Sequence, residues 1–94
     1  MSRIEGFVVR EAVSKAKAAG WFVRPLCWTG SRDAPDRFFL KDGRTVLIEF
    51  KSPGVKPRPG QVNEIAEIKR HGGEVYVCDT VHAALVALKI IAPE

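Results

Sequence analysis

The Asp42-Gly43 dipeptide constrains the fold of this chain more than any other feature of its sequence. It separates two short runs that are rich in hydrophobic residues, 37–41 and 45–51. Asp-Gly tolerates the positive φ angles that a two-residue turn between antiparallel strands requires. We therefore predict a β-hairpin over these residues, and with it a sheet at the centre of the molecule.

The second strand of this hairpin carries charge on one face only. Because strand side chains alternate between the two faces, Glu49 and Lys51 point to the same side. The opposite face carries Val46, Ile48 and Phe50. The turn also folds the end of the second strand back toward Asp36, which opens the first strand. The sequence thus predicts that two carboxylates and one ammonium group converge at one end of the hairpin.

The remaining elements follow from apolar periodicity and from turn residues. The prolines of 52–60 predict an irregular loop there. Thr80 or Asp79 is expected to cap the last helix, and Pro25 to confine its strand to an edge or a bulge. We predict helices over residues 3–19, 61–71 and 81–91 and further strands over 21–28 and 74–80.

This order, α-β-β-β-α-β-α, predicts an α/β fold with a mixed sheet of about four strands flanked by helices. The first three strands would form a meander. The fourth, which follows a helical crossover, would pair in parallel with one of them.

The composition of the chain limits the classes of protein to which it can belong. A chain of 94 residues with 46% apolar and 28% charged residues is typical of one folded domain, 1–94. A net charge of +4 favours a polyanionic partner. No apolar run is long enough for a membrane span or a signal peptide, so we expect a cytoplasmic protein. Cys27 and Cys78 lack metal-binding spacing and are expected to be buried free thiols.

The chemistry follows from the charged end of the hairpin. Two carboxylate oxygens suit Mg²⁺ or Mn²⁺, which keep several waters and bind substrate phosphate. Lys51 could then orient an attacking water or neutralise charge that grows on the phosphate. The alternative is an ordinary solvent-facing strand on which Glu49 and Lys51 are merely polar.

Two motifs carry a resemblance to known enzymes. Pro35-Asp36 followed by Glu49-Phe50-Lys51 resembles the signature of the PD-(D/E)xK nucleases. Across nearly the whole chain, the sequence resembles the virus-type replication-repair nuclease domain, VRR-NUC. That likeness is carried by Glu11, Gly30, the IEFK segment 48–51, Gln61 and the GGEVYVCDT segment 72–80.

The resemblance implies a stand-alone minimal nuclease of the kind that phages and bacteria encode. It implies metal-dependent hydrolysis of DNA, preferably branched DNA such as junctions or flaps, in replication, repair or recombination, and frequently a homodimer. The small size of the chain and its apolar last helix also favour a homodimer.

The same resemblance implies the roles of the site residues. Asp36 and Glu49 would be metal ligands together with the backbone carbonyl of Phe50, and Lys51 would be the catalytic lysine. Glu11, directly or through a water, and Gln61 would complete the site.

The residues themselves leave two of these roles open. Glu11 shares a helical stripe with Ile4, Phe7 and Val8, where an unpaired carboxylate is costly, but a pair with Lys15 would explain it equally. Gln61 begins a stripe continued by Ile65 and Ile68, yet it could be an ordinary polar residue at a helix start.

Basic loops flank the proposed site. We expect side chains of these loops to contact DNA phosphates without recognising bases. The competing explanation is that they are ordinary charged loop residues exposed to solvent. The residues concerned are Ser31, Arg32, Lys56 and Arg58. Asp33 could be an outer carboxylate of the site or simply part of a turn. A noncatalytic nucleic-acid-binding module and a partner-binding protein with an accidental E-x-K are the rival functions.

Overall fold

The order of elements predicted from the sequence is confirmed. The computed structural model describes residues 2–93. It contains α1 (Arg3–Ala18), β1 (Phe22–Pro25), β2 (Arg37–Lys41), β3 (Arg44–Phe50), α2 (Pro59–Arg70), β4 (Glu74–Cys78) and α3 (Val81–Ala87).

The four strands form one mixed sheet in the order β1-β2-β3-β4. β1 pairs antiparallel with β2, β2 antiparallel with β3, and β3 parallel with β4. Asp42 and Gly43 have φ angles of 50° and 80°, as the two central residues of a hairpin turn require. Pro25 lies in an edge strand, where its missing N–H costs no hydrogen bond within the sheet.

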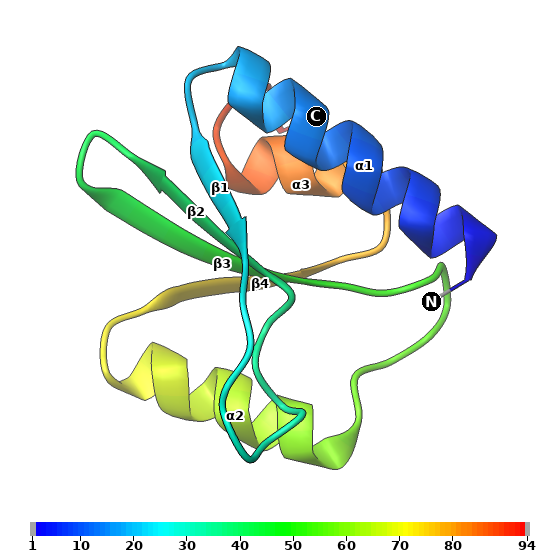
Figure 1. The fold of residues 1–94 in the computed structure, drawn as a ribbon, viewed down its shortest axis with the longest axis vertical. Coiled ribbons are helices and arrows are strands. Elements are labelled where there is room, and N and C mark those ends of the chain that lie inside the picture. Colours follow the sequence, from blue (N-terminus) through cyan, green and yellow to red (C-terminus); the bar gives the residue numbers. More distant parts are fainter. Residues whose placement is uncertain (1, 94) are drawn as a thin grey trace.

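Helices cover both faces of the sheet (Figure 1). α1 and α3 lie over one face and α2 over the other. The hydrophobic core fills the space between the sheet and the α1/α3 layer, where Val46, Ile48 and Phe50 meet residues such as Val9 and Ala84. The alternation predicted for β3 is therefore confirmed, and Glu49 points to the face that α2 covers.

The first predicted strand, 21–28, is shorter than expected. β1 ends at Pro25, and one further hydrogen bond joins the Leu26 N–H to the Asp36 carbonyl at 3.0 Å. Beyond it the chain leaves the sheet, and Trp28 forms only an isolated bridge with Ser31. Cys27 is consequently exposed, which corrects the prediction of a buried thiol, whereas Cys78 is buried; both are free.

Two helix boundaries differ from the sequence prediction by two residues or more. α2 begins at Pro59, inside the segment that we expected to be a loop, because proline is compatible with the first turn of a helix. α3 ends at Ala87 instead of residue 91, and Lys89 has a φ of 58°, outside the helical region. Thr80 caps α3 as predicted, since its hydroxyl accepts from the Ala83 N–H at 3.0 Å. None of the helices in residues 2–93 is long and apolar enough to cross a membrane.

Candidate active site

The predicted site residues gather at one end of the sheet. Asp36 immediately precedes β2, Glu49 lies near the end of β3, and Gln61 lies in the first turn of α2. Parallel strands end at the same edge, and the Lys51 N–H donates to the Cys78 carbonyl at 3.0 Å, at the end of β4. Sequence segments far apart in the chain therefore meet at this edge.

Glu49 is the centre of the cluster. It is only 2% exposed. Its Oε2 accepts a hydrogen bond from Gln61 Nε2 at 2.7 Å and lies 3.1 Å from Lys51 Nζ. Its Oε1 is buried and has no hydrogen-bond partner among residues 2–93. A buried, unpaired carboxylate oxygen is costly, so this atom calls for a cation or another donor.

The electrostatics of Glu49 agree with this reading. Burial, followed by repulsion from the Asp36 carboxylate, raises the pKa of Glu49 above its ordinary value. Hydrogen bonds from Lys51 and Gln61 act in the opposite direction. Burial of Glu49 and its repulsion from Asp36 therefore disfavour the charged pair, and a bound divalent cation would stabilise it.

Asp36 has a structural contact in addition to its place in the site. Its Oδ2 accepts a hydrogen bond from the backbone N–H of Phe50 at 2.8 Å. Phe50 is 1% exposed, so this donor sits at the edge of the core. Asp36 thereby fixes the end of β3, the segment that carries Glu49 and Lys51.

Gln61 is held at both ends of its amide group. It is buried, its Nε2 donates to Glu49, and its Oε1 accepts from the Arg58 N–H at 3.1 Å. The second contact also satisfies one of the free backbone groups at the start of α2. Gln61 thus orients the Glu49 carboxylate, and it is more than a polar residue at a helix start.

The donor set fits a divalent cation that keeps much of its own water. Asp36 and Glu49 supply two hard carboxylates, and Mg²⁺ commonly binds through one or two carboxylates plus substrate phosphate. Within residues 2–93, no three side chains of the His, Cys, Asp and Glu types form a group that could hold a metal ion. Among the described residues, no third acid is therefore close enough to bind the same ion directly.

Glu11, the third acid predicted for the site, does not join Asp36 and Glu49 in such a group among the described residues. Only part of the stripe that led us to predict it is buried: Ile4 is 60% and Phe7 is 54% exposed, whereas Val8 is buried. Glu11 itself is half-buried. The alternative explanation, a Glu11–Lys15 ion pair, does not appear either among the described residues. The catalytic role of Glu11 stays a prediction that this arrangement does not favour.

Glu5 is the acid that the sequence reasoning missed. It precedes Val9, Ala12 and Ala16 by 4, 7 and 11 positions, so it lies on the buried stripe of α1, and it is half-buried. The Ser2 hydroxyl lies 2.6 Å from that of Ser52, which places the first turn of α1 beside the residue that follows Lys51. The spacing of Glu5 from these apolar residues is visible in the sequence and could have placed it on this stripe.

The predicted DNA-binding loops adjoin one another. Ser31, Arg32 and Lys56 are exposed, as such contacts require. Arg58 Nη2 donates to the Arg32 carbonyl at 2.7 Å and lies 3.4 Å from Asp33 Oδ1. Part of the Arg58 side chain therefore joins the two loops.

The position of Asp33 clarifies its role. A Cβ added at Gly60 would lie 2.6 Å from Asp33 Oδ2, so the Asp33 carboxylate packs directly against the first turn of α2. This contact explains why position 60 holds a glycine. Asp33 anchors the loop to α2.

A mixed four-stranded sheet with this order of helices, and with an acid, a buried acid and a lysine at one edge, defines the architecture of PD-(D/E)xK-type nucleases. A solved structure described as "VRR_NUC domain" is similar to this chain with a TM-score of 0.86 and 28% identity, over 94% of this chain and 97% of that one. A protein of Acyrthosiphon pisum secondary endosymbiont phage 1, named "Putative nuclease p44", is 32% identical over 77 residues, which is 81% of this chain and 83% of that protein. No family model matches the chain. The chain belongs to the VRR-NUC family of nucleases.

Proposed function

We propose that this protein is a Mg²⁺- or Mn²⁺-dependent endonuclease that hydrolyses DNA phosphodiester bonds. The single observation that carries the proposal is the buried, partnerless Oε1 of Glu49, beside the second carboxylate of Asp36. A fold that needed Glu49 only for structure would pair both of its oxygens.

Asp36 and Glu49 would hold the cation, with the backbone carbonyl of Phe50 as a further ligand. When bound, such an ion neutralises charge on the scissile phosphate and lowers the pKa of a water. The water gives up a proton as its oxygen bonds to phosphorus, the bond from phosphorus to the leaving sugar oxygen breaks, and that oxygen takes up a proton, so water is consumed with no net proton change at these atoms.

The chain's own residues position these groups. The Lys51 ammonium, 3.1 Å from Glu49 Oε2, is placed to donate to the attacking water or to the phosphate. Gln61 keeps the Glu49 carboxylate in one orientation. The first turns of α1 and α2 lie at the same edge, and helix N-termini favour anions such as phosphate.

Glu5 is a better candidate than Glu11 for a third acid that acts through water. Both acids are half-buried, but Glu5 lies on the buried stripe of α1 and near Ser52, whereas the stripe of Glu11 is largely exposed. Glu5→Gln and Glu11→Gln form a matched pair with the same loss of charge on the same helix. Glu5→Gln should lower the cleavage rate strongly and Glu11→Gln only weakly. A larger loss of cleavage rate in Glu11→Gln than in Glu5→Gln would instead support a role for Glu11 in the site.

Branched DNA and a homodimer are the finer parts of the proposal. β4 is an edge strand of the sheet, and it exposes Tyr76 and Val77, which are 37% and 44% accessible. An exposed apolar edge strand is a surface that a second copy can cover. Two copies related by symmetry would present two sites to the two strands of a junction. Analytical ultracentrifugation at micromolar concentration tests the dimer, and a purely monomeric protein would refute it.

The cleavage test uses branched, flapped, linear and single-stranded DNAs with Mg²⁺ or Mn²⁺, with EDTA, and with the Glu49→Gln variant. We expect cutting that needs the cation, is faster on branched DNA and is lost in the variant. A wild-type protein that binds DNA but never cuts it would support the rival function, a noncatalytic nucleic-acid-binding module.

A further inference from the structure

The outer side of α1 carries a line of basic residues that the predicted loop contacts do not include. Arg3, Arg10 and Lys17 follow one another at intervals of seven residues, close to two turns of helix, so they lie along one side of it. All three are exposed. None of them belongs to an ion pair in the described part of the chain. We call these three residues the basic line.

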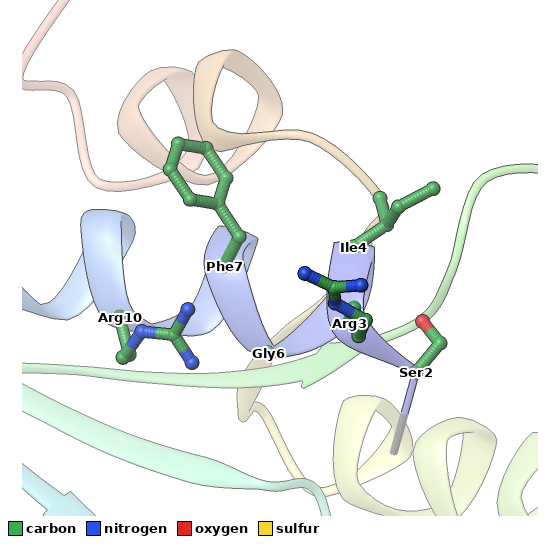
Figure 2. Close-up of a pocket in the computed structure, with 6 residues that line it drawn as sticks. All are labelled: Ser2, Arg3, Ile4, Gly6, Phe7 and Arg10. Carbon is green, nitrogen blue, oxygen red and sulfur yellow. The ribbon is translucent and has the colours of Figure 1, made fainter.

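The first half of the basic line borders an open hollow of about 600 Å³. Figure 2 shows the guanidinium groups of Arg3 and Arg10 on either side of Gly6, with Phe7 rising from the helix between them. Gly6 is buried and has no side chain, so the backbone forms the floor of the hollow. Ile4 and Phe7 contribute apolar surface, because more than half of each remains exposed.

The second half of the basic line borders another hollow, of about 390 Å³. Arg10, Lys17 and Arg37 line it together, along with Val9, Val13 and Ser14. Arg37 follows Asp36 directly in the chain, and its Nη1 donates to the Asp36 carbonyl at 3.0 Å. A fourth cation therefore connects this hollow to the edge of the candidate active site.

The basic line also approaches the site from its other end. Arg3 follows Ser2, whose hydroxyl contacts that of Ser52, one residue beyond Lys51. Figure 1 shows the segment after β3 passing close to the N-terminal end of α1. The basic line is thus continuous with the site both through Arg37 and through Ser2.

We propose that the DNA strand flanking the scissile phosphate binds along the outer side of α1. Arg3, Arg10, Lys17 and Arg37 would contact its phosphates, and Phe7 would stack on an unpaired base of a single-stranded arm. The helix rise places successive residues of the basic line about 10 Å apart, so the line spans about 21 Å, long enough for its cations to contact several phosphates of one strand. An exposed aromatic ring between cations is the arrangement that binds single strands. This inference relies on the proposed function for its substrate.

The test compares two double variants with the same loss of charge. Arg3→Gln/Arg10→Gln removes two cations of the basic line. Lys69→Gln/Arg70→Gln removes two exposed cations from the end of α2, on the opposite side of the sheet (Figure 1). Fluorescence anisotropy would measure binding of a labelled duplex with a single-stranded arm, in EDTA and over a range of salt concentrations. EDTA prevents cleavage, so binding is measured alone.

We expect the α1 double variant to bind about 10-fold or more weakly at 0.1 M salt, and its log–log salt slope to fall by about 1.5 to 2, which corresponds to two lost phosphate contacts. The α2 double variant should bind like the wild type. Phe7→Ala should weaken binding of the armed DNA about fivefold or more and leave plain duplex binding unchanged. Equal affinity and equal slope for the two double variants would overturn the proposal and assign the basic line to another partner, such as an acidic protein.

These outcomes are separate from the fate of the proposed function. A wild-type protein that never cuts DNA would refute the nuclease, yet the binding comparison would still decide the role of α1. In a cutting protein, the α1 double variant should raise KM and leave kcat nearly unchanged, because its residues lie outside the cluster of Asp36, Glu49 and Lys51. A fall in kcat alone would contradict a binding role.

Discussion

Replacement of Asp36 should separate its structural contact from its chemistry. Asp36 Oδ2 accepts the Phe50 N–H at 2.8 Å, and Asp36→Ala leaves that donor without a partner at the edge of the core. A hydrogen bond to an ionised group contributes about 1.5–3 kcal/mol. A loss of about 2 kcal/mol in a domain of this size lowers Tm by roughly 8–16 °C.

Asp36→Asn is the matched control, because its amide oxygen can still accept from Phe50 while the negative charge is gone. In EDTA, where metal does not contribute, we expect the asparagine variant to lose less than about 1 kcal/mol. Thermal and urea unfolding measure both variants, and cleavage of branched DNA with Mg²⁺ measures their activity. Both should be inactive, but only alanine should be much less stable. Equal stability of the two variants would refute the structural role of Asp36.

Three further predictions follow from the same geometry. Lys51→Ala should lower the cleavage rate by about 100-fold or more while Mn²⁺ binding persists, as calorimetry can test; wild-type cutting would exclude its role. Since burial and Asp36 raise the pKa of Glu49, this group keeps its proton to higher pH than usual, so Mn²⁺ affinity should increase with pH and binding should release protons. Titrations in buffers of different ionisation enthalpy detect that release, and equal heats would contradict it. Gly60→Ala should destabilise the fold by about 1–3 kcal/mol through its clash with Asp33, and Asp33→Ala should relieve the loss; an undisturbed single variant would disprove that contact.

Local sequence rules predicted most of the fold because the hairpin determines so much of it. The Asp42-Gly43 turn sets the register of β2 and β3, and the alternation along β3 separates the core face from Glu49. The same two rules bring Asp36 and Lys51 to one edge. The parallel pairing of β4 followed from the helical crossover before it, and the structure shows that its partner is β3.

The errors concern features of the structure that depend on contacts between distant parts of the chain. On α1, apolar residues occur on more than one side, and the sequence does not say which side the sheet covers; the stripe with Glu5 is buried and the one with Glu11 is largely exposed. The hydrogen bond from Gln61 to Glu49 likewise depends on where α2 begins, and we placed that helix start two residues too late.

The most direct test of the central claim is a crystal structure of the protein with Mn²⁺, with the ion located by its anomalous scattering. We expect a single strong peak between the Asp36 carboxylate and Glu49 Oε1, and no peak there in Glu49→Gln. Manganese bound elsewhere on the protein, with Glu49 Oε1 still free of any cation, would contradict it.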